Sequence, residues 1–212
     1  MGKSDDIEDL SFRLIDEKVN LKNYNAYERF IVKKLIHTTG DFDFAKNTVF
    51  SNKAIEKAFN AFENNTPIIC DTTMVKAGIT KRYLDVVKIN TYCFINYKIV
   101  IKKANISNNT RAETALDYCK KKFNKAIFAI GNAPTALNKL LKLYGNGEIN
   151  PILVIGLPVG FVGAEESKRR LINHNELAYI TNFGPKGGSA CAATVVNGLI
   201  TLFKDHSKKN MV

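Results

Sequence analysis

Residues 125–172, KAIFAIGNAPTALNKLLKLYGNGEINPILVIGLPVGFVGAEESKRRLI, contain one pattern twice: a short apolar run, a loop rich in Gly and Pro, and a segment with helical periodicity. The apolar runs cover residues 127–130 and 152–157, and their continuity is typical of strands that are buried on both faces. The helical segments that follow cover residues 133–144 and 164–173. Strands that alternate with helices predict a parallel sheet with right-handed crossover connections.

The rest of the chain extends this pattern in both directions. Three further strands are expected, a weak one within residues 92–101 and clearer ones at 67–71 and 178–182. Helical periodicity predicts helices over residues 7–17, 25–36, 52–63, 110–122 and 188–203. No internal repeat or linker divides the chain, so residues 1–212 are predicted to form a single domain. The expected fold is α/β: a three-layer α/β/α arrangement around a mostly parallel five-stranded sheet, with a helical N-terminal lead-in.

The composition excludes several classes of protein. Of the 212 residues, 45% are apolar and 24% are charged, which is ordinary for a globular chain and unlike a disordered or low-complexity one. No stretch approaches the roughly 18 consecutive apolar residues of a membrane span, so no membrane partner is expected. The first residues, MGKSDDIEDL, lack the apolar centre of a signal peptide, and we expect a cytoplasmic protein.

Charge is the one unusual property. The 31 Lys and Arg residues against 20 Asp and Glu residues give a formal net charge of +11, and a positive field attracts nucleic acid, anionic membranes or acidic small molecules. Few of these residues are Arg, the side chain that most often reads bases, and they do not form the basic stripe with interleaved aromatic platforms that is typical of single-strand binders. Nucleic acid is therefore not expected as a partner, and most of the lysines are interpreted as solvated surface.

Cysteine spacing argues against a metal or disulfide framework. Cys70, Cys93, Cys119 and Cys191 lie more than 20 residues apart and form no CxxC pair. No histidine stands at metal-ligand spacing from any of them. They are interpreted as buried thiols, and no protein-bound metal is expected.

Four loops that follow predicted strands are candidates for binding a ligand, because ligands of open α/β sheets bind beyond the carboxyl ends of the strands. We refer to residues 70–73, 131–135, 156–163 and 184–189 as the rim loops. Their glycines let backbone approach a ligand, and the helices that follow offer free N–H groups, so the rim loops suit a large anion. None matches a dinucleotide or phosphate-loop fingerprint, and tight turns without a ligand would explain each loop equally well.

Two charged clusters have simple structural interpretations. Residues 165–170, EESKRR, place acids and bases at helical spacing, as on a solvated helix face with acids at its positive end. Asp41 and Asp43 follow Gly40 and are expected to cap a short helix.

Among the three histidines, only His37 is placed for chemistry. It ends an amphipathic helix, where the helix dipole favours an imidazolium that can donate a proton. A surface or capping histidine is the alternative interpretation. No Ser-His-Asp or Cys-His arrangement can be recognised from chain order.

Six segments, in register along nearly the whole chain, closely resemble the precorrin-8X methylmutase family and its cobalt-precorrin-8 counterparts. They are FAIGNAPTAL (128–137), GLPVGFVGAEESK (156–168), GPKGGSA (184–190), CDTTMVKAGI (70–79), IHTTGDF (36–42) and the block at residues 7–17 that contains Ser11. HTTGDFDF is more similar to the cobalt-dependent members than to the metal-free ones. The resemblance takes residues 1–212 as one precorrin-8X methylmutase domain.

The resemblance implies an isomerase of cobalamin biosynthesis with a flavodoxin-like fold and a homodimeric assembly. Such an enzyme moves a methyl group from carbon 11 to carbon 12 of (cobalt-)precorrin-8 by a 1,5-sigmatropic shift, giving cobyrinate or hydrogenobyrinate. The family's catalytic histidine falls on His37, its substrate-contacting serine falls on Ser11, and Thr80 and Arg111 match substrate-pocket positions. No cofactor is implied, since any cobalt is carried by the substrate. The alternative is a non-catalytic carrier of corrinoids or other tetrapyrroles.

Overall fold

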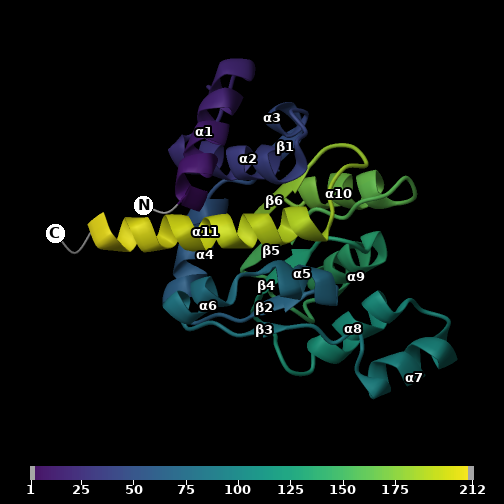
Figure 1. The fold of residues 1–212 in the computed structure, drawn as a ribbon. Helices are drawn as coiled ribbons and strands as arrows, with labels where there is room; N and C mark the ends of the chain where they lie inside the picture. Colours follow the sequence, from purple (N-terminus) through teal and green to yellow (C-terminus); the bar gives the residue numbers. More distant parts are fainter. Residues whose placement is uncertain (1–2, 210–212) are drawn as a thin grey trace.

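The computed structural model describes residues 3–209, with side chains from residue 6 to residue 208. Within this range the chain forms one six-stranded sheet, in the order β1-β6-β5-β4-β2-β3, between two layers of helices (Figure 1). The strands are β1 (Thr48–Phe50), β2 (Ile68–Cys70), β3 (Thr91–Tyr92), β4 (Ile127–Ile130), β5 (Leu153–Gly156) and β6 (Tyr179–Asn182). Every pair is parallel except β1 with β6.

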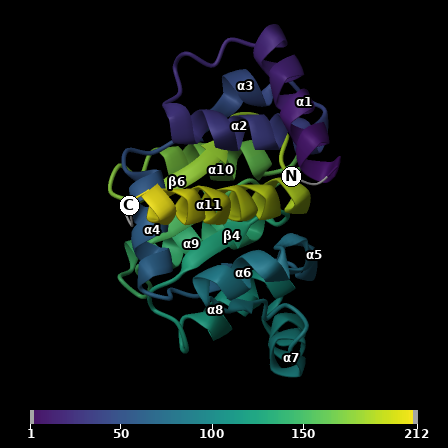
Figure 2. The same ribbon diagram turned by 60° about the vertical axis from the view of Figure 1, so that its left-hand side comes forward.

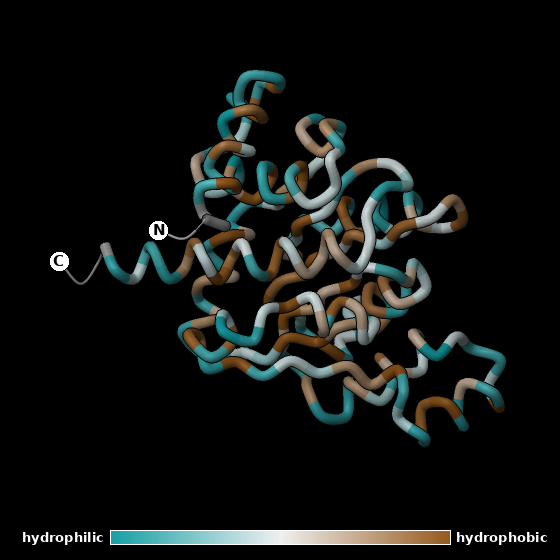
Figure 3. The backbone as a smooth tube through the Cα atoms, viewed as in Figure 1, coloured by the Kyte–Doolittle hydropathy of each residue, from teal (hydrophilic) through white to brown (hydrophobic). Residues whose placement is uncertain are grey.

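Alternate residues of the central strands enter two separate hydrophobic cores. On β4, Ile127 and Ala129 pack in the first core, whereas Phe128 and Ile130 pack in the second. Both faces of the sheet are thus covered, as parallel sheets require. Figure 3 shows the hydrophobic segments gathered on these central strands.

Each core has its own layer of helices (Figures 1 and 2). The first layer contains α2 (Ala26–Thr39), α3 (Phe44–Asn47), α4 (Ala54–Glu63), α5 (Thr73–Gly78), α6 (Lys81–Val87) and α11 (Ser189–Lys209), and α1 (Lys3–Lys18) lies outside α2. The second layer contains α7 (Lys98–Ser107), α8 (Arg111–Cys119), α9 (Pro134–Gly145) and α10 (Ala164–Ile172).

The α/β fold class is confirmed, but the expectation of five strands is wrong in two places. Strand β1, which was not predicted, follows the helical lead-in. It has three residues, too few to show an alternation of apolar and polar side chains, and it is held by antiparallel pairing to β6. Of the residues 92–101, within which a strand was expected, only Tyr92 belongs to a strand, at the end of β3. Residues 98–101 belong to helix α7. Aromatic residues of this segment join a cluster in which the Tyr92, Phe94 and Phe123 rings pack together instead of extending the ladder.

The loop after β4 leaves no room for a side chain at Gly131. A Cβ there would lie 2.8 Å from Ser189 Cα and 2.8 Å from Val75 Cγ2. The close approach joins the end of β4 to the start of α11 and to α5. Gly131 is therefore a packing requirement of this edge of the sheet.

We predict that Gly131→Ala lowers the free energy of unfolding by about 1–3 kcal/mol, because the added methyl overpacks the edge. The matched control is Gly145→Ala at the end of α9, where a Cβ meets nothing within 4 Å. The control should be neutral or stabilising by up to about 1 kcal/mol. Urea unfolding of the three proteins measures both effects, and equal midpoints would contradict the packing argument.

Candidate active site

The structure brings Ser11 and His37 together although they are 26 residues apart. Helix α2 starts with a capping box formed by Asn25 and Glu28 and ends at Gly40, which takes the left-handed conformation. His37 lies in its last turn. Helix α1 crosses α2 so that Ser11 Oγ is 2.8 Å from His37 Nδ1, and the two side chains form a hydrogen-bonded pair.

The crossing of α1 over α2 is held by apolar and ionic contacts. The Phe12 ring meets the rings of Phe30 and His37 edge-on, at centroid distances of 5.8 and 6.3 Å. Lys34 Nζ lies 2.7 Å from the Glu8 carboxylate, and Lys33 pairs with Asp16. Together these contacts fix the register that places Ser11 against His37.

The second ring nitrogen of His37 has no hydrogen-bond partner among the described residues. The imidazole is exposed, and within residues 3–209 no hydrogen bond to Nε2 is found. A histidine with one nitrogen bound to a hydroxyl and the other facing solvent can donate a proton to a bound molecule.

Helix α11 links the end of α2 to the turn that carries Thr80. Thr194 Oγ1 lies 3.0 Å from Thr38 Oγ1, next to His37. One turn later, Asn197 Oδ1 accepts from the Thr80 N–H at 2.9 Å, and Asn197 Nδ2 donates to the Gly78 carbonyl. Figure 1 shows α11 running between α2 on one side and α5 and α6 on the other. Thr80 and His37 therefore belong to the same helical layer.

Arg111 lies in the other layer. It is the exposed first residue of α8, whose apolar face packs in the second core. The preceding residue, Thr110, lies 3.1 Å through Oγ1 from Thr135 Oγ1 at the start of α9, so Arg111 is at the same edge of the sheet as the rim loops. Figure 2 shows α8 and α2 on opposite sides of α11. Within one chain, Arg111 is not brought together with Ser11 and His37.

Asp71 occupies the backbone donors of one rim loop. Its buried carboxylate accepts hydrogen bonds from the N–H groups of Gly131, Asn132 and Ala133, at 3.1, 2.8 and 2.8 Å. Burial raises the pKa of Asp71, and these three hydrogen bonds oppose that rise. The expectation that this loop offers free amides to an anion is therefore wrong at these three positions, since the Asp71 carboxyl group already accepts from their N–H groups.

Two other rim loops are joined by backbone hydrogen bonds and expose apolar side chains. Gly160 N donates to the Pro185 carbonyl at 3.0 Å, and Gly188 N donates to the Leu157 carbonyl at 2.8 Å. Phe161 and Val162, at the tip of the first of these loops, are 96% and 90% exposed. This part of the edge presents apolar surface, which the anion-based interpretation did not anticipate.

Lys168 is buried, although the sequence interpretation placed it on a solvated helix face. Its ammonium donates to Asn182 Oδ1 at 3.1 Å and to the Lys186 carbonyl at 2.7 Å. Helical spacing contained the missed signal, because residues 164, 168 and 171 share one face and Ala164 and Leu171 are apolar. The expected pairing on the exposed face does occur, between Arg169 and Glu165.

Asp41 and Asp43 both bind a lysine. Asp41 Oδ1 also accepts from the Asp43 N–H at 3.0 Å, just ahead of α3. Asp43 occupies the N-cap position of α3 but makes no side-chain capping hydrogen bond. Both carboxylates lie 2.6 Å from Lys186 Nζ. The hydrogen bond from Lys186 lowers the pKa of Asp41 and raises that of Lys186.

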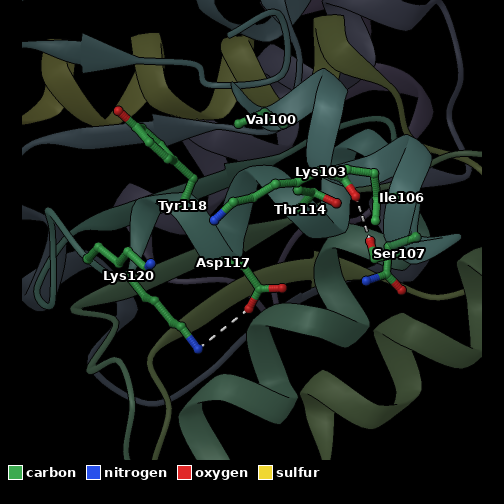
Figure 4. A pocket seen from close by; sticks show the side chains of 10 residues that line it. Val100, Lys103, Ile106, Ser107, Thr114, Asp117, Tyr118 and Lys120 are labelled. Carbon is green, nitrogen blue, oxygen red and sulfur yellow. Dashed lines mark hydrogen bonds and ion pairs between the residues drawn. The ribbon is translucent and has the colours of Figure 1, made fainter. Parts of the chain in front are cut away.

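A surface pocket of about 380 Å³ lies between α7 and α8, in the second layer (Figure 4). Its wall includes Asp117, 3.5 Å from Lys120, which also pairs with Glu148. None of Ser11, His37 and Thr80 lines this pocket.

The described part of the chain contains no group of three or more His, Cys, Asp or Glu side chains placed to hold a metal ion. Between residues 3 and 209, no helix combines the length and apolarity needed to cross a bilayer. Cys70, Cys119 and Cys191 are buried free thiols, as expected, whereas Cys93 is only half-buried.

Comparison with known proteins places this chain among α/β isomerases. The family model of precorrin-8X methylmutase matches residues 6–202. A cobalt-precorrin-8 methylmutase of Leptospira interrogans is 37% identical over 92% of each chain, and one of Methanocaldococcus jannaschii is 38% identical over 91% of this chain and 87% of that one. The crystal structure of precorrin-8x methyl mutase from Thermus thermophilus superposes with a TM-score of 0.88 at 32% identity, covering 97% of this chain and 98% of the other. The chain belongs to the precorrin-8X methylmutase family.

Buried Lys168 yields a pH-dependence prediction. Burial lowers its pKa to about 8, from an ordinary value of 10.5. Between these two values the unfolded chain binds more protons than the folded one at this site, so the contribution of Lys168 to the free energy of unfolding rises with pH. Its unfavourable effect is complete below pH 8 and is relieved toward pH 10.5.

We therefore expect the free energy of unfolding of wild type to rise relative to that of Lys168→Met between about pH 8 and about pH 10. The slope should approach about 1 kcal/mol per pH unit. Urea unfolding at several pH values measures it. Arg169→Met on the same helix is the control, because a guanidinium does not titrate in this range. A pH-independent difference for Lys168→Met would show that its pKa is not lowered.

Proposed function

We propose that this chain is a cobalt-precorrin-8 methylmutase that moves the methyl group from carbon 11 to carbon 12 of the macrocycle. The observation that carries the proposal is the Ser11–His37 pair, in which Nδ1 is hydrogen-bonded and the imidazole is exposed. The two relatives described above are named for the cobalt substrate, which favours the cobalt form over the metal-free one. No cofactor is required of the protein, since the cobalt belongs to the substrate.

His37 supplies the proton chemistry of the reaction. As an imidazolium, it donates Nδ1–H to Ser11 Oγ and offers Nε2–H to the conjugated macrocycle. Hydrogen bonding or proton transfer from Nε2 draws electron density through the conjugated system and lowers the barrier to methyl migration. After migration the proton returns to Nε2, so atoms and charge balance. Ser11 accepts from Nδ1–H throughout, which holds the ring in one orientation.

The remaining surface suits a corrinoid, which has an apolar macrocycle face and carboxylates at its periphery. Phe161 and Val162 offer apolar contact to the face of the macrocycle, and Thr80 adds a polar group in the same layer as His37. Arg111 suits the peripheral carboxylates, because a guanidinium binds a carboxylate through two parallel hydrogen bonds.

The position of Arg111 supports a homodimer with shared sites. Arg111 and His37 lie in opposite helical layers of one chain, so a second copy is needed to bring both to one substrate. An apolar stripe on α1 supports the same arrangement: Ile7, Leu10 and Leu14 are 58%, 52% and 48% exposed beside Ser11. Spacing of three and four residues places these three side chains on one face of the helix, as an interface requires.

We further propose that the enzyme works in the cytoplasm. Its free thiols, such as Cys70 and Cys191, suit a reducing compartment.

His37→Ala should reduce turnover of cobalt-precorrin-8 by about 10²- to 10⁴-fold, the usual contribution of general acid catalysis. Corrinoid binding, measured by the change in its absorption spectrum, should persist because the substitution removes a proton donor and little surface. His174→Ala is the control, since that histidine packs on Tyr144 in the second layer. Wild type that binds corrinoid but turns over neither cobalt-precorrin-8 nor precorrin-8 would identify a carrier instead of an enzyme.

Shared sites predict complementation between inactive subunits. His37→Ala and Arg111→Ala homodimers should each be nearly inactive, whereas a mixed dimer keeps one intact site in which both residues are native. Random co-assembly should then restore about a quarter of wild-type activity, because about half of the dimers are mixed and each has one intact site of two. Differently tagged, co-expressed subunits allow this measurement, with light scattering to verify the dimer. No recovery from a purified mixed dimer would mean that Arg111 and His37 do not share a site across the interface.

A further inference from the structure

Lys168 carries a buried charge that the reaction described above does not use. Its ammonium has two oxygen partners, the Asn182 side chain and the Lys186 carbonyl, and neither is a carboxylate. Removing an ammonium from water without a direct counter-ion is unfavourable. Such a group needs a reason beyond stability, and its contacts indicate what it holds in place.

The loop at residues 183–188 is the segment that Lys168 holds. The Lys186 carbonyl accepts from both Lys168 Nζ and Asn182 Nδ2, at 2.7 and 2.9 Å. The next residue, Gly187, has φ +157°, and a Cβ there would lie 2.3 Å from the Leu157 carbonyl oxygen. The backbone at Lys186 is therefore fixed by its hydrogen bond from the Lys168 ammonium and by the close packing of Gly187 against Leu157 of the neighbouring rim loop.

The side chain of Lys186 carries this anchoring to the end of α2. Its ammonium lies 2.6 Å from carboxylate oxygens of both Asp41 and Asp43. Asp41 N donates to Thr39 Oγ1 at 3.2 Å, and Thr39 Oγ1 donates to the Leu35 carbonyl at 2.8 Å. His37 lies between Leu35 and Thr39 in this last turn. A continuous set of contacts thus joins buried Lys168 to the turn that carries His37.

We propose that Lys168 and Lys186 are positioning residues: Lys168 fixes the backbone of the 183–188 loop, and Lys186 extends from it to hold the end of α2, which sets the orientation of His37 against Ser11. The functional consequence rests on the proposed role of His37 as proton donor. The mechanical link does not rest on that role, and it can be tested without substrate.

Surface ion pairs alone contribute little to stability, because water and salt screen them. The Lys186 pairs differ because the backbone of Lys186 is held by a buried group, so less side-chain and loop freedom remains to be lost. A small displacement at a catalytic group is costly, since a misplacement of about 1 Å can reduce rate by about 10²-fold.

The first experiment observes His37 directly. The chain contains three histidines, so selective ¹⁵N-histidine labelling gives three side chains to follow by NMR. In Lys186→Met and in Lys168→Met, the His37 ring resonances should shift and broaden. Those of His206 should stay in place, because that ring packs on Phe59 near the far end of α11. Lys139→Met is the matched control, since it removes a lysine paired with Asp117 in the second layer.

The order of the contacts makes the test stricter. If Lys168 acts through Lys186, adding Lys168→Met to Lys186→Met should move the His37 resonances little further. Unchanged His37 resonances in both single variants, or equal shifts in the Lys139→Met control, would overturn the proposal. If Lys168→Met does not fold, Lys168→Gln, which shortens the reach but keeps an N–H donor, is measured in its place. Lys186→Met tests the second link independently.

Turnover provides the functional measurement. Lys186→Met should lower kcat about 10-fold with KM within about twofold of wild type, because it displaces the proton donor and removes none of the side chains proposed to contact the substrate. Shifted His37 resonances with unchanged kcat would leave the mechanical link intact and overturn its functional consequence. Unshifted resonances together with a large loss in His37→Ala would refute the link and leave that role intact.

Discussion

Burial of the parallel sheet on both faces is the constraint on which the rest of this structure depends. Strands β2, β4 and β5 direct alternate apolar residues into two separate cores, so helices must cover both faces. Every crossover then starts a helix near the carboxyl edge of the strands, and the loops that can carry function gather there. The same constraint divides the candidate site, because α2 covers one face and α8 covers the other.

Buried ionisable groups organise this edge in two different ways. The buried carboxyl group of Asp71 accepts from three backbone N–H groups and holds the loop after β4. The buried amino group of Lys168 donates to Asn182 at the end of β6 and to the backbone of the loop that follows. Loops made of Gly and Pro have few side chains with which to hold themselves, so buried groups from neighbouring elements supply the hydrogen bonds. The edge is therefore pre-ordered, and Phe161 and Val162 remain as its exposed apolar part.

The candidate site contains one side chain suited to donating a proton, and the rest of it is surface suited to positioning a substrate. A methyl migration within one molecule needs a positioned substrate and a single proton donor, and it needs neither a nucleophile nor an electron carrier. The pairing of Ser11 with His37 and the contacts around Thr80 are consistent with a reaction that needs few reactive groups. The precision of the site then depends on how firmly α1, α2 and α11 are held to each other.

Local pattern was sufficient to predict most of this protein. Continuous apolar runs at residues 127–130 and 152–157, each followed by helical spacing, indicated parallel strands and their crossovers, because both signals arise within a few residues of the chain. His37 was recognised as the last turn of a helix by the Gly40 stop, and family resemblance selected Ser11, Thr80 and Arg111. The α/β class and the family follow from the sequence by itself.

Tertiary structure decided whatever depends on distant partners. Strand β1 exists because β6 pairs with it, and residues 98–107 form a helix because the aromatic cluster takes the place of a longer ladder. Lys168 is buried because the loop that follows β6, at residues 183–188, closes over it, and Arg111 lies apart from His37 because the sheet stands between their helices. These features depend on contacts between different elements of the fold. The free energy of such contacts cannot be predicted from the local sequence pattern of either element.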